Sequence, residues 1–152
     1  MRSNDRKRPA FTLIEVLLVV LIIGMLAGVF IVGYAGVQGR AKIDTTRNKL
    51  KASIASAVEL FNLHIGHYPT EEEGGLQALR TKPTFTDETL AEKWAGPYLT
   101  EDPVDEWGQP FNYQPLDAAT AAEVGVPFKL WSNGPDKQDG TEDDIRNWTE
   151  QR

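Results

Sequence analysis

The feature that most restricts this chain is an apolar run from Phe11 to Val37 that contains no Lys or Arg. Roughly 20 helical residues cross the ~30 Å hydrocarbon core of a bilayer, so the run is long enough to span it. Four basic residues precede the run, at Arg2, Arg6, Lys7 and Arg8. Basic residues stay on the cytoplasmic side. We therefore expect a cytoplasmic leader at 1–10, a transmembrane helix at 11–37, and the rest of the chain beyond the membrane.

Charge and cysteine content exclude several function classes. Residues 1–10 carry a net charge of +3 and the remaining chain carries −9. An acidic chain is a poor nucleic-acid binder because phosphate contacts dominate that affinity, so we expect no nucleic-acid partner. The sequence has no cysteine, which excludes disulfides, thiolate metal sites and a cysteine nucleophile.

Glu15 is the one carboxylate within the apolar run. A carboxylate in a membrane helix costs a few kcal/mol or more, and it needs a partner or a functional reason. One interpretation is that Glu15 lies shallow enough to reach the lipid headgroups, and the other is that it pairs with a cation. A secretory signal does not explain the segment, because the run is too long and no clear cleavage site follows it.

A helical pattern continues beyond the apolar run. Apolar residues recur at spacings of 7, 4, 4, 3 and 4, which places them on one helix face: Ile43, Leu50, Ile54, Val58, Phe61 and Ile65. Gly66 and Pro69 are typical of a helix end. We expect an amphipathic helix at 38–65, continuous with the apolar run over roughly 80 Å and with a local bend or melting around Gly33–Gly39. Its first half requires a membrane and then other subunits to cover it.

Residues 66–152 are predicted to form a small globular domain. The pattern indicates a turn and a short helix around Leu76–Leu79. The best strand candidates are Phe111–Gln114 and Pro127–Ser132, which we expect to pair in a short antiparallel sheet. The predicted fold class is therefore α+β.

The residues that follow the leader resemble a known signal. Ala10-Phe11-Thr12-Leu13-Ile14-Glu15, between a basic leader and an apolar helix, is similar to the class III signal of type IV pilins and pseudopilins. Four later segments resemble the major, G-type pseudopilin of type II secretion systems. They are Gly-x-Tyr-Pro-Thr at 66–70, Gly-Leu-x-Ala-Leu at 75–79, Trp-x-Gly-Pro-Tyr-Leu at 94–99 and Asp-Pro-x-Asp-x-Trp-Gly-x-Pro at 102–110.

The resemblance implies a processing step and a role for Glu15. In that family a prepilin peptidase cuts before the Phe and methylates the new amine, which here means a cut between Ala10 and Phe11 and N-methylation of Phe11. The family nearly always has Gly where this chain has Ala10. Glu15 becomes the fifth residue of the mature chain, where the family pairs its acidic residue with the terminal amine of a neighbouring subunit. Opposite charges in a low dielectric are costly when unpaired.

The resemblance also implies a pilin-like fold and a structural role. The long N-terminal helix packs on a small C-terminal domain with a short antiparallel sheet and a calcium-binding loop. Subunits form a helical homopolymer in the periplasm that drives export of folded proteins across the outer membrane. The implied partners are minor pseudopilins, the prepilin peptidase, the inner-membrane assembly platform and inner-membrane lipid. The alternative is a type IV pilus subunit for adhesion, motility or DNA uptake, which the missing cysteines and the central motifs argue against.

Five carboxylates crowd the segment before the C-terminus: Asp136, Asp139, Glu142, Asp143 and Asp144. Their spacing is not that of an EF-hand. From composition alone, the segment is either a solvated acidic turn or a site for Ca²⁺, which prefers hard oxygen ligands. The resemblance implies one structural calcium ion with Asp136, Asp143 and Asp144 as side-chain ligands. Asp139 and Ser132 are further candidate ligands.

No constellation typical of an enzyme is present in the sequence. His64 and His67 lie three residues apart, but no Ser or Cys nucleophile signature accompanies them. The resemblance implies that a cytoplasmic ATPase supplies the energy for export, and this chain has no phosphate-binding Gly-Lys-Ser/Thr motif of its own. The four tryptophans are interpreted as core or loop anchors. We expect a structural protein and not an enzyme.

Overall fold

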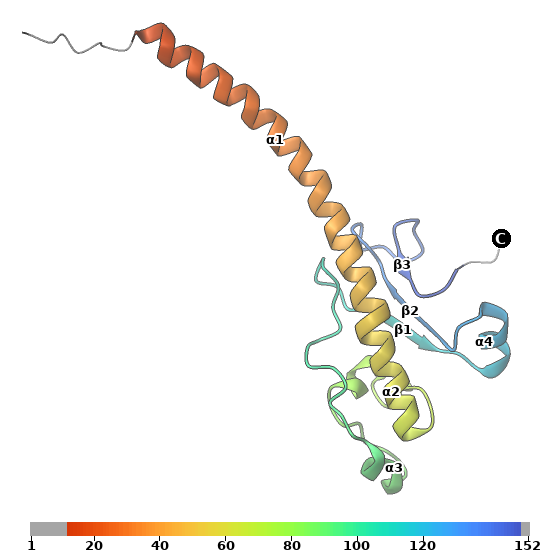
Figure 1. Ribbon diagram of the computed structural model, residues 1–152. Coiled ribbons are helices and arrows are strands. Elements are labelled where there is room, and N and C mark those ends of the chain that lie inside the picture. The colour runs from red at the N-terminus through yellow and green to blue at the C-terminus, as the bar shows by residue number, and fades with distance from the viewer. Residues whose placement is uncertain (1–11, 150–152) are drawn as a thin grey trace, which may run out of the picture. The chain divides into compact units, whose positions relative to one another are not determined.

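The computed structural model describes residues 12–149, except that the side chains of residues 27–37 are not described. The predicted leader at 1–10 and Phe11 lie outside the described residues. The chain divides into two compact units, Met1–Arg40 and Ala41–Arg152. Figure 1 shows the elements of both units.

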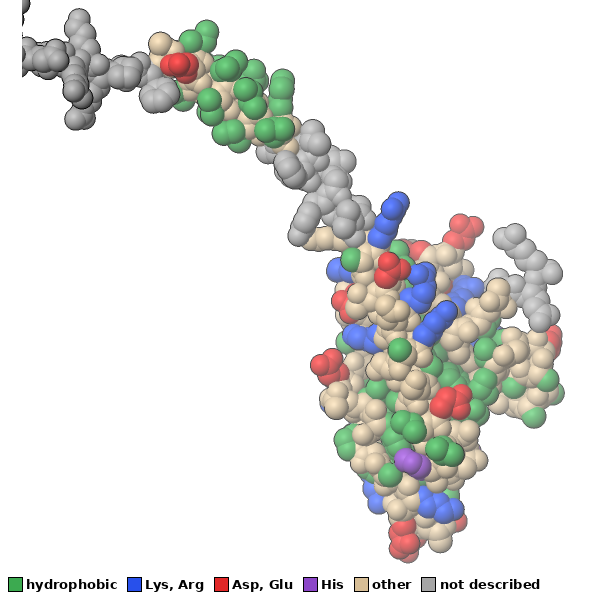
Figure 2. Space-filling view, viewed as in Figure 1, with side chains coloured by type: hydrophobic (Ala, Val, Ile, Leu, Met, Phe, Trp, Pro, Cys, Tyr) green, Lys and Arg blue, Asp and Glu red, His purple; other side chains and the backbone are tan. Residues whose placement is uncertain are grey.

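Helix α1 extends from Leu13 to Asn48. The helix is uninterrupted through Gly33–Gly39, so the local melting expected there does not occur. Its described large apolar side chains up to Leu26 are exposed, from 48% at Ile22 to 85% at Leu13 (Figure 2). Within the described part of the chain, no helix has an apolar stretch long enough to cross a membrane. The side chains of residues 27–37, which belong to the predicted span, are not among those described.

The helical segment continues after α1 with two further elements. A π-helical turn, η1, covers Lys49–Ile54, and α2 covers Ala55–Ile65. Helix α2 ends at Gly66, whose φ of 98° is a left-handed conformation that suits glycine. The predicted apolar stripe is confirmed: five of its residues are buried, namely Leu50, Ile54, Val58, Phe61 and Ile65, and Ile43 packs against the same core.

A three-stranded antiparallel sheet packs against this helix. Its strands are β1 (Asn112–Pro115), β2 (Phe128–Ser132) and β3 (Ile145–Arg146), in the order β1-β2-β3. The two predicted strands are confirmed to within one residue, and both pair antiparallel. Strand β3 was not predicted, because two residues are too few to show an alternating pattern. Phe128 and Leu130 of β2 are buried in the core.

Three short helices complete the domain. The 3₁₀ helix η2 (Gly75–Leu79) confirms the predicted short helix, and Leu76, Ala78 and Leu79 are buried. Helices α3 (Glu88–Lys93) and α4 (Ala118–Val124) were not predicted. Each begins after an aspartate whose side chain accepts backbone N–H groups of the first turn, Asp87 for α3 and Asp117 for α4. These helix-capping aspartates were the signal in the sequence that could have predicted the two helices.

The tryptophans are anchors, as interpreted from the sequence. Trp94 packs against the core and donates its Nε1–H to the carbonyl of Ala78. Trp107 also packs against the core, while Trp131 and Trp148 meet edge to face with ring centres 5.7 Å apart. The architecture of the second unit is therefore a helix packed on a small antiparallel sheet, which confirms the α+β class.

Candidate functional site

The acidic loop joins β2 to β3 and contains residues 133–144. Ser132 pairs with Ile145 across the two strands, so the loop begins and ends at the same place. The side chain of Asn147 reinforces this closure. Its Oδ1 accepts from the N–H of Leu130 at 2.8 Å, and its Nδ2 donates to the carbonyl of Phe128 at 2.9 Å. The core strand β2 thus fixes the base of the loop.

A buried hydrogen bond ties the start of the loop to a distant turn. The hydroxyl of Ser132 donates to Oδ2 of Asp105 at 2.6 Å and accepts from the N–H of Gly134 at 3.1 Å. The other oxygen of Asp105 accepts from the N–H groups of Trp107 and Gln109. Both Ser132 and Asp105 are buried. Ser132, a candidate calcium ligand, is therefore held here by protein groups.

Gly134 is required by the path of the loop. Its φ is 65°, and a Cβ atom there would lie 2.5 Å from the carbonyl oxygen of Asp143. Real Cβ atoms do not approach an oxygen so closely. Any other residue at position 134 would therefore push the backbone there away from the backbone at Asp143.

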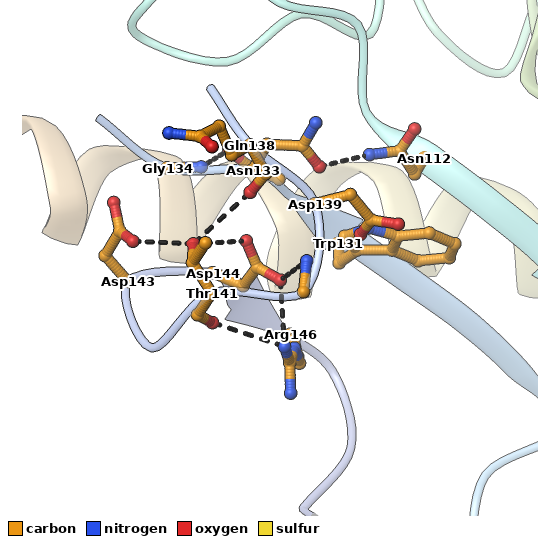
Figure 3. Close-up of polar contacts among 12 residues, drawn as sticks. Asn112, Trp131, Asn133, Gly134, Gln138, Asp139, Thr141, Asp143, Asp144 and Arg146 are labelled. Atoms are coloured by element: carbon orange, nitrogen blue, oxygen red, sulfur yellow. Dashed lines mark hydrogen bonds and ion pairs between the residues drawn. The ribbon is translucent and has the colours of Figure 1, made fainter. Parts of the chain in front are cut away.

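Asp136 and Asp143 lie next to each other in the loop. The N–H of Asp136 donates to Oδ2 of Asp143 at 3.2 Å. The hydroxyl of Thr141 donates to Oδ1 of Asp143 at 2.7 Å (Figure 3). The hydrogen bond from Thr141 lowers the pKa of Asp143 below its ordinary value. Oδ1 of Asp136 accepts from the N–H of Gln138 at 2.9 Å.

The other predicted ligands have protein partners of their own. The side chain of Asp144 is only 1% exposed, and its Oδ2 lies 2.8 Å from the guanidinium of Arg146 and accepts from the N–H of Gly140. Arg146 also donates to the carbonyl of Thr141 at 3.3 Å. Asp139 accepts from the indole N–H of Trp131 at 2.7 Å (Figure 3). In the described part of the chain, no three carboxylate or imidazole side chains gather into a metal site.

Sequence reasoning identified the loop but missed three of the residues that shape it. Asp105 lies in a segment that carried the resemblance, and Arg146 and Asn147 directly follow the acidic segment, yet none of the three was assigned a role. The Asp-Pro-x-Asp-x-Trp-Gly-x-Pro segment could have indicated Asp105, because an aspartate two residues before a Trp-Gly turn is well placed to accept backbone N–H groups.

At the other end of the described chain, Glu15 contacts Thr12. One carboxylate oxygen of Glu15 accepts from the backbone N–H of Thr12 at 2.9 Å and from its hydroxyl at 3.0 Å. Glu15 therefore satisfies donors at the beginning of α1. The predicted cleavage position at Ala10 and Phe11 lies outside the described residues.

The two histidines have surface contacts. Nδ1 of His64 lies 3.0 Å from the hydroxyl of Tyr98, and Nδ1 of His67 lies 3.0 Å from the carbonyl of Tyr68. His67 also pairs with Glu73 at 3.4 Å. Each histidine therefore has a polar partner within the domain.

The family model described as type II secretion system (T2SS), protein G matches residues 34–148, and this range includes the acidic loop and its contacts with Asp105. The chain belongs to this family. A second model, the prokaryotic N-terminal methylation motif, matches residues 5–31. The methylation-motif match covers the N-terminal signal, and the protein G match covers the four later segments that resemble the G-type pseudopilin.

Similar proteins extend over nearly the whole chain. The type II secretion system core protein G of Pseudomonas aeruginosa is 36% identical over 146 residues, which cover 94% of this chain and 96% of the relative. The core protein G of Escherichia coli K12 is 33% identical over 148 residues, which cover 97% of this chain and 95% of the relative. The crystal structure of the major pseudopilin from enterohaemorrhagic Escherichia coli aligns with a TM-score of 0.54 and 28% identity, over 77% of this chain and 93% of that one. This chain is thus a pseudopilin, a structural subunit.

Proposed function

We propose that this pseudopilin polymerises into the helical pseudopilus filament that drives export of folded proteins across the outer membrane. The observation that carries the proposal is the exposed apolar surface of α1 between Leu13 and Leu26. Transfer of such surface out of water is worth about 25 cal/mol per Å², so a bare helix of this kind is not stable in water. Before assembly, membrane lipid surrounds the apolar side chains of α1, and after assembly the helices of other copies pack against them.

Deletion of the gene tests the proposal. Loss of secreted enzymes from the medium, with twitching motility intact, is the expected result. Unchanged secretion with lost motility would favour a type IV pilus subunit instead. A Glu15→Gln variant separates anchoring from assembly, because it removes the charge of Glu15 and leaves the apolar helix. We expect it to remain in the membrane but to form fewer filaments.

The proposed precursor has a single membrane span at 11–37 and a C-terminal domain in the periplasm. A prepilin peptidase removes residues 1–10 and methylates Phe11. The new amine then pairs with Glu15 of a neighbouring copy, in place of the contacts that Glu15 makes with Thr12. Minor pseudopilins and the inner-membrane assembly platform are the further partners. The N-terminal methylation motif at residues 5–31 supports this sequence of events.

The acidic loop is proposed to bind one structural calcium ion. Asp136 and Asp143 provide hard oxygen atoms on adjacent parts of the loop, which suits Ca²⁺ chemically. Asp144 is the third proposed ligand, although Arg146 already neutralises it. Asp139 and Ser132 are weaker candidates because Trp131 and Asp105 hold them. The ion would offset the mutual repulsion of the carboxylates and stabilise the loop on the domain.

A further inference from the structure

Asn133 and Gly134 form the only Asn-Gly pair in the sequence, and they begin the acidic loop. In such a pair the backbone nitrogen of the glycine can attack the side-chain carbonyl carbon of the asparagine, because glycine has no Cβ atom to obstruct the approach. The other asparagines of the chain precede larger residues, namely Asp5, Lys49, Leu63, Tyr113 and Trp148. The local sequence therefore makes Asn133 the asparagine most prone to deamidation.

Deamidation at this pair consumes water and needs no oxidant or reductant. The nitrogen of Gly134 loses its proton and bonds to Cγ of Asn133, while the Cγ–Nδ2 bond breaks and the amide nitrogen leaves as ammonia with that proton. Water then opens the cyclic imide at either of its carbonyl carbons. One opening gives an ordinary aspartate. The other gives isoaspartate, in which the backbone runs through the side-chain carbon.

The structure restrains the attacking nitrogen. The N–H of Gly134 donates to the hydroxyl oxygen of Ser132 at 3.1 Å. That hydroxyl is fixed in turn by its 2.6 Å hydrogen bond to Asp105, and both Ser132 and Asp105 are buried. A buried, hydrogen-bonded N–H is protected from base until the structure opens locally. The nitrogen of Gly134 therefore cannot lose its proton while the base of the loop is closed.

A second contact restrains the side chain that would be attacked. Oδ1 of Asn133 accepts from Nδ2 of Asn112 at 2.7 Å (Figure 3). Asn112 is the first residue of β1, which pairs with β2 in the sheet. The backbone of Gly134 also lies so close to Asp143 that a Cβ atom would come 2.5 Å from its carbonyl oxygen. Ring closure therefore requires the contacts on both sides of the Asn-Gly bond to open.

We propose that Asn133 is a site of spontaneous deamidation, and that the hydrogen bonds at the base of the acidic loop set its rate. The closed loop keeps the amide intact, and opening of the loop releases the nucleophile and the carbonyl carbon together. The product adds a carboxylate to a loop that already contains five. In the isoaspartate product an extra methylene enters the backbone, which displaces the N–H of Gly134 from Ser132. Modification therefore makes an opening of the loop permanent.

Peptide mass spectrometry of the full-length chain in detergent tests the proposal. The measurement follows replacement of the Asn133 amide by a carboxyl group at mildly alkaline pH. We expect slow conversion in the folded chain and severalfold faster conversion in urea, because unfolding removes both restraints. Asn133→Gln is the chemical control, since its longer side chain closes a ring less readily, and it should stay unconverted over the same period. No conversion in urea, or equal rates with and without urea, would overturn the proposal.

Two variants test the restraints separately. Ser132→Ala removes the acceptor of the Gly134 N–H, and Asn112→Ala removes the donor to Asn133. Each is expected to accelerate deamidation of the folded chain severalfold. The matched control is Thr120→Ala, which removes a side-chain hydrogen bond at the cap of α4, in the same domain.

Circular dichroism establishes that each variant is folded at the incubation temperature. Asn112 is only partly buried, so its variant carries the test if Ser132→Ala does not fold. Equal acceleration by Thr120→Ala would show that general destabilisation sets the rate and would contradict control by the loop base. Unchanged rates in the folded Ser132→Ala and Asn112→Ala chains would contradict it as well.

Discussion

The hydroxyl of Ser132 donates a 2.6 Å hydrogen bond to the buried carboxylate of Asp105, across 27 residues of sequence. This bond joins the last residue of β2 to the turn at 105–109, and Asp105 organises that turn by accepting from the N–H groups of Trp107 and Gln109. The acidic loop therefore begins from a fixed point.

The first prediction concerns this fixed point. Asp105→Ala leaves the buried hydroxyl of Ser132 and the partly buried N–H groups of Trp107 and Gln109 without an acceptor, so we expect it to lower the free energy of unfolding by about 3 kcal/mol. Ser132→Ala removes one donor and is expected to cost about 1–2 kcal/mol. Urea unfolding of the 41–152 fragment measures both. Equal stability of Asp105→Ala and the parent would contradict the role of Asp105 as the acceptor that holds this fixed point.

The second prediction concerns Gly134. A methyl group at this position approaches the carbonyl oxygen of Asp143 to 2.5 Å, in addition to the strain of its positive φ. Gly140 provides the matched control, because its φ is 85° and a Cβ atom there has nothing within 4 Å. We expect Gly140→Ala to cost about 1 kcal/mol and Gly134→Ala clearly more. Thermal unfolding of both variants compares them, and a smaller loss for Gly134→Ala would be inconsistent with this geometry.

The third prediction concerns calcium. A ligand at 100 times its Kd stabilises a fold by about 2.7 kcal/mol, so saturating Ca²⁺ is expected to raise the Tm of the 41–152 fragment by several degrees over EDTA. Asp136→Asn and Asp143→Asn should remove this increment. Asp139→Asn should retain most of it, because Asp139 is directed to Trp131. A Tm that does not respond to Ca²⁺ would mean that Arg146 and Thr141 hold the loop without a metal.

The fourth prediction concerns processing. Intact-mass measurement of the membrane-extracted protein is expected to show loss of residues 1–10 and gain of one methyl group. An Ala10→Gly variant restores the residue typical of the family before the cut, so its precursor should be processed at least as fast in a pulse-chase experiment. A stable full-length product in both chains would overturn the cleavage proposal.

The fifth prediction concerns the cap of α4. Hydrogen bonds from Thr120 and Ala119 lower the pKa of Asp117 below its ordinary value of 3.8. Its ionised form therefore stabilises the fold above that value, and the contribution is lost as the pH falls through the lowered pKa. The difference in Tm between the parent and Asp117→Asn should be constant near neutral pH and should shrink below pH 3.8. A difference that grows on acidification would contradict the assignment.

Residues close together in the sequence were sufficient to predict several elements. The stripe from Leu50 to Ile65 recurs at helical spacing, and Gly66 ends the helix because it readily adopts a positive φ. The strand at 128–132 shows alternating burial. Each of these signals depends on local backbone geometry, which nearby residues determine.

The roles of Asp105, Arg146 and Asn147 depended on the tertiary structure. Asp105 meets Ser132, and Asn147 meets Phe128, only after the sheet has formed. The sequence showed five carboxylates in one segment, but the fold determined their partners: Arg146 for Asp144 and Trp131 for Asp139. The apolar run, the amphipathic helix and the family motifs were thus readable from the sequence alone. The packed loop was not, because hydrogen bonds and charges act over distances in space that chain spacing does not encode.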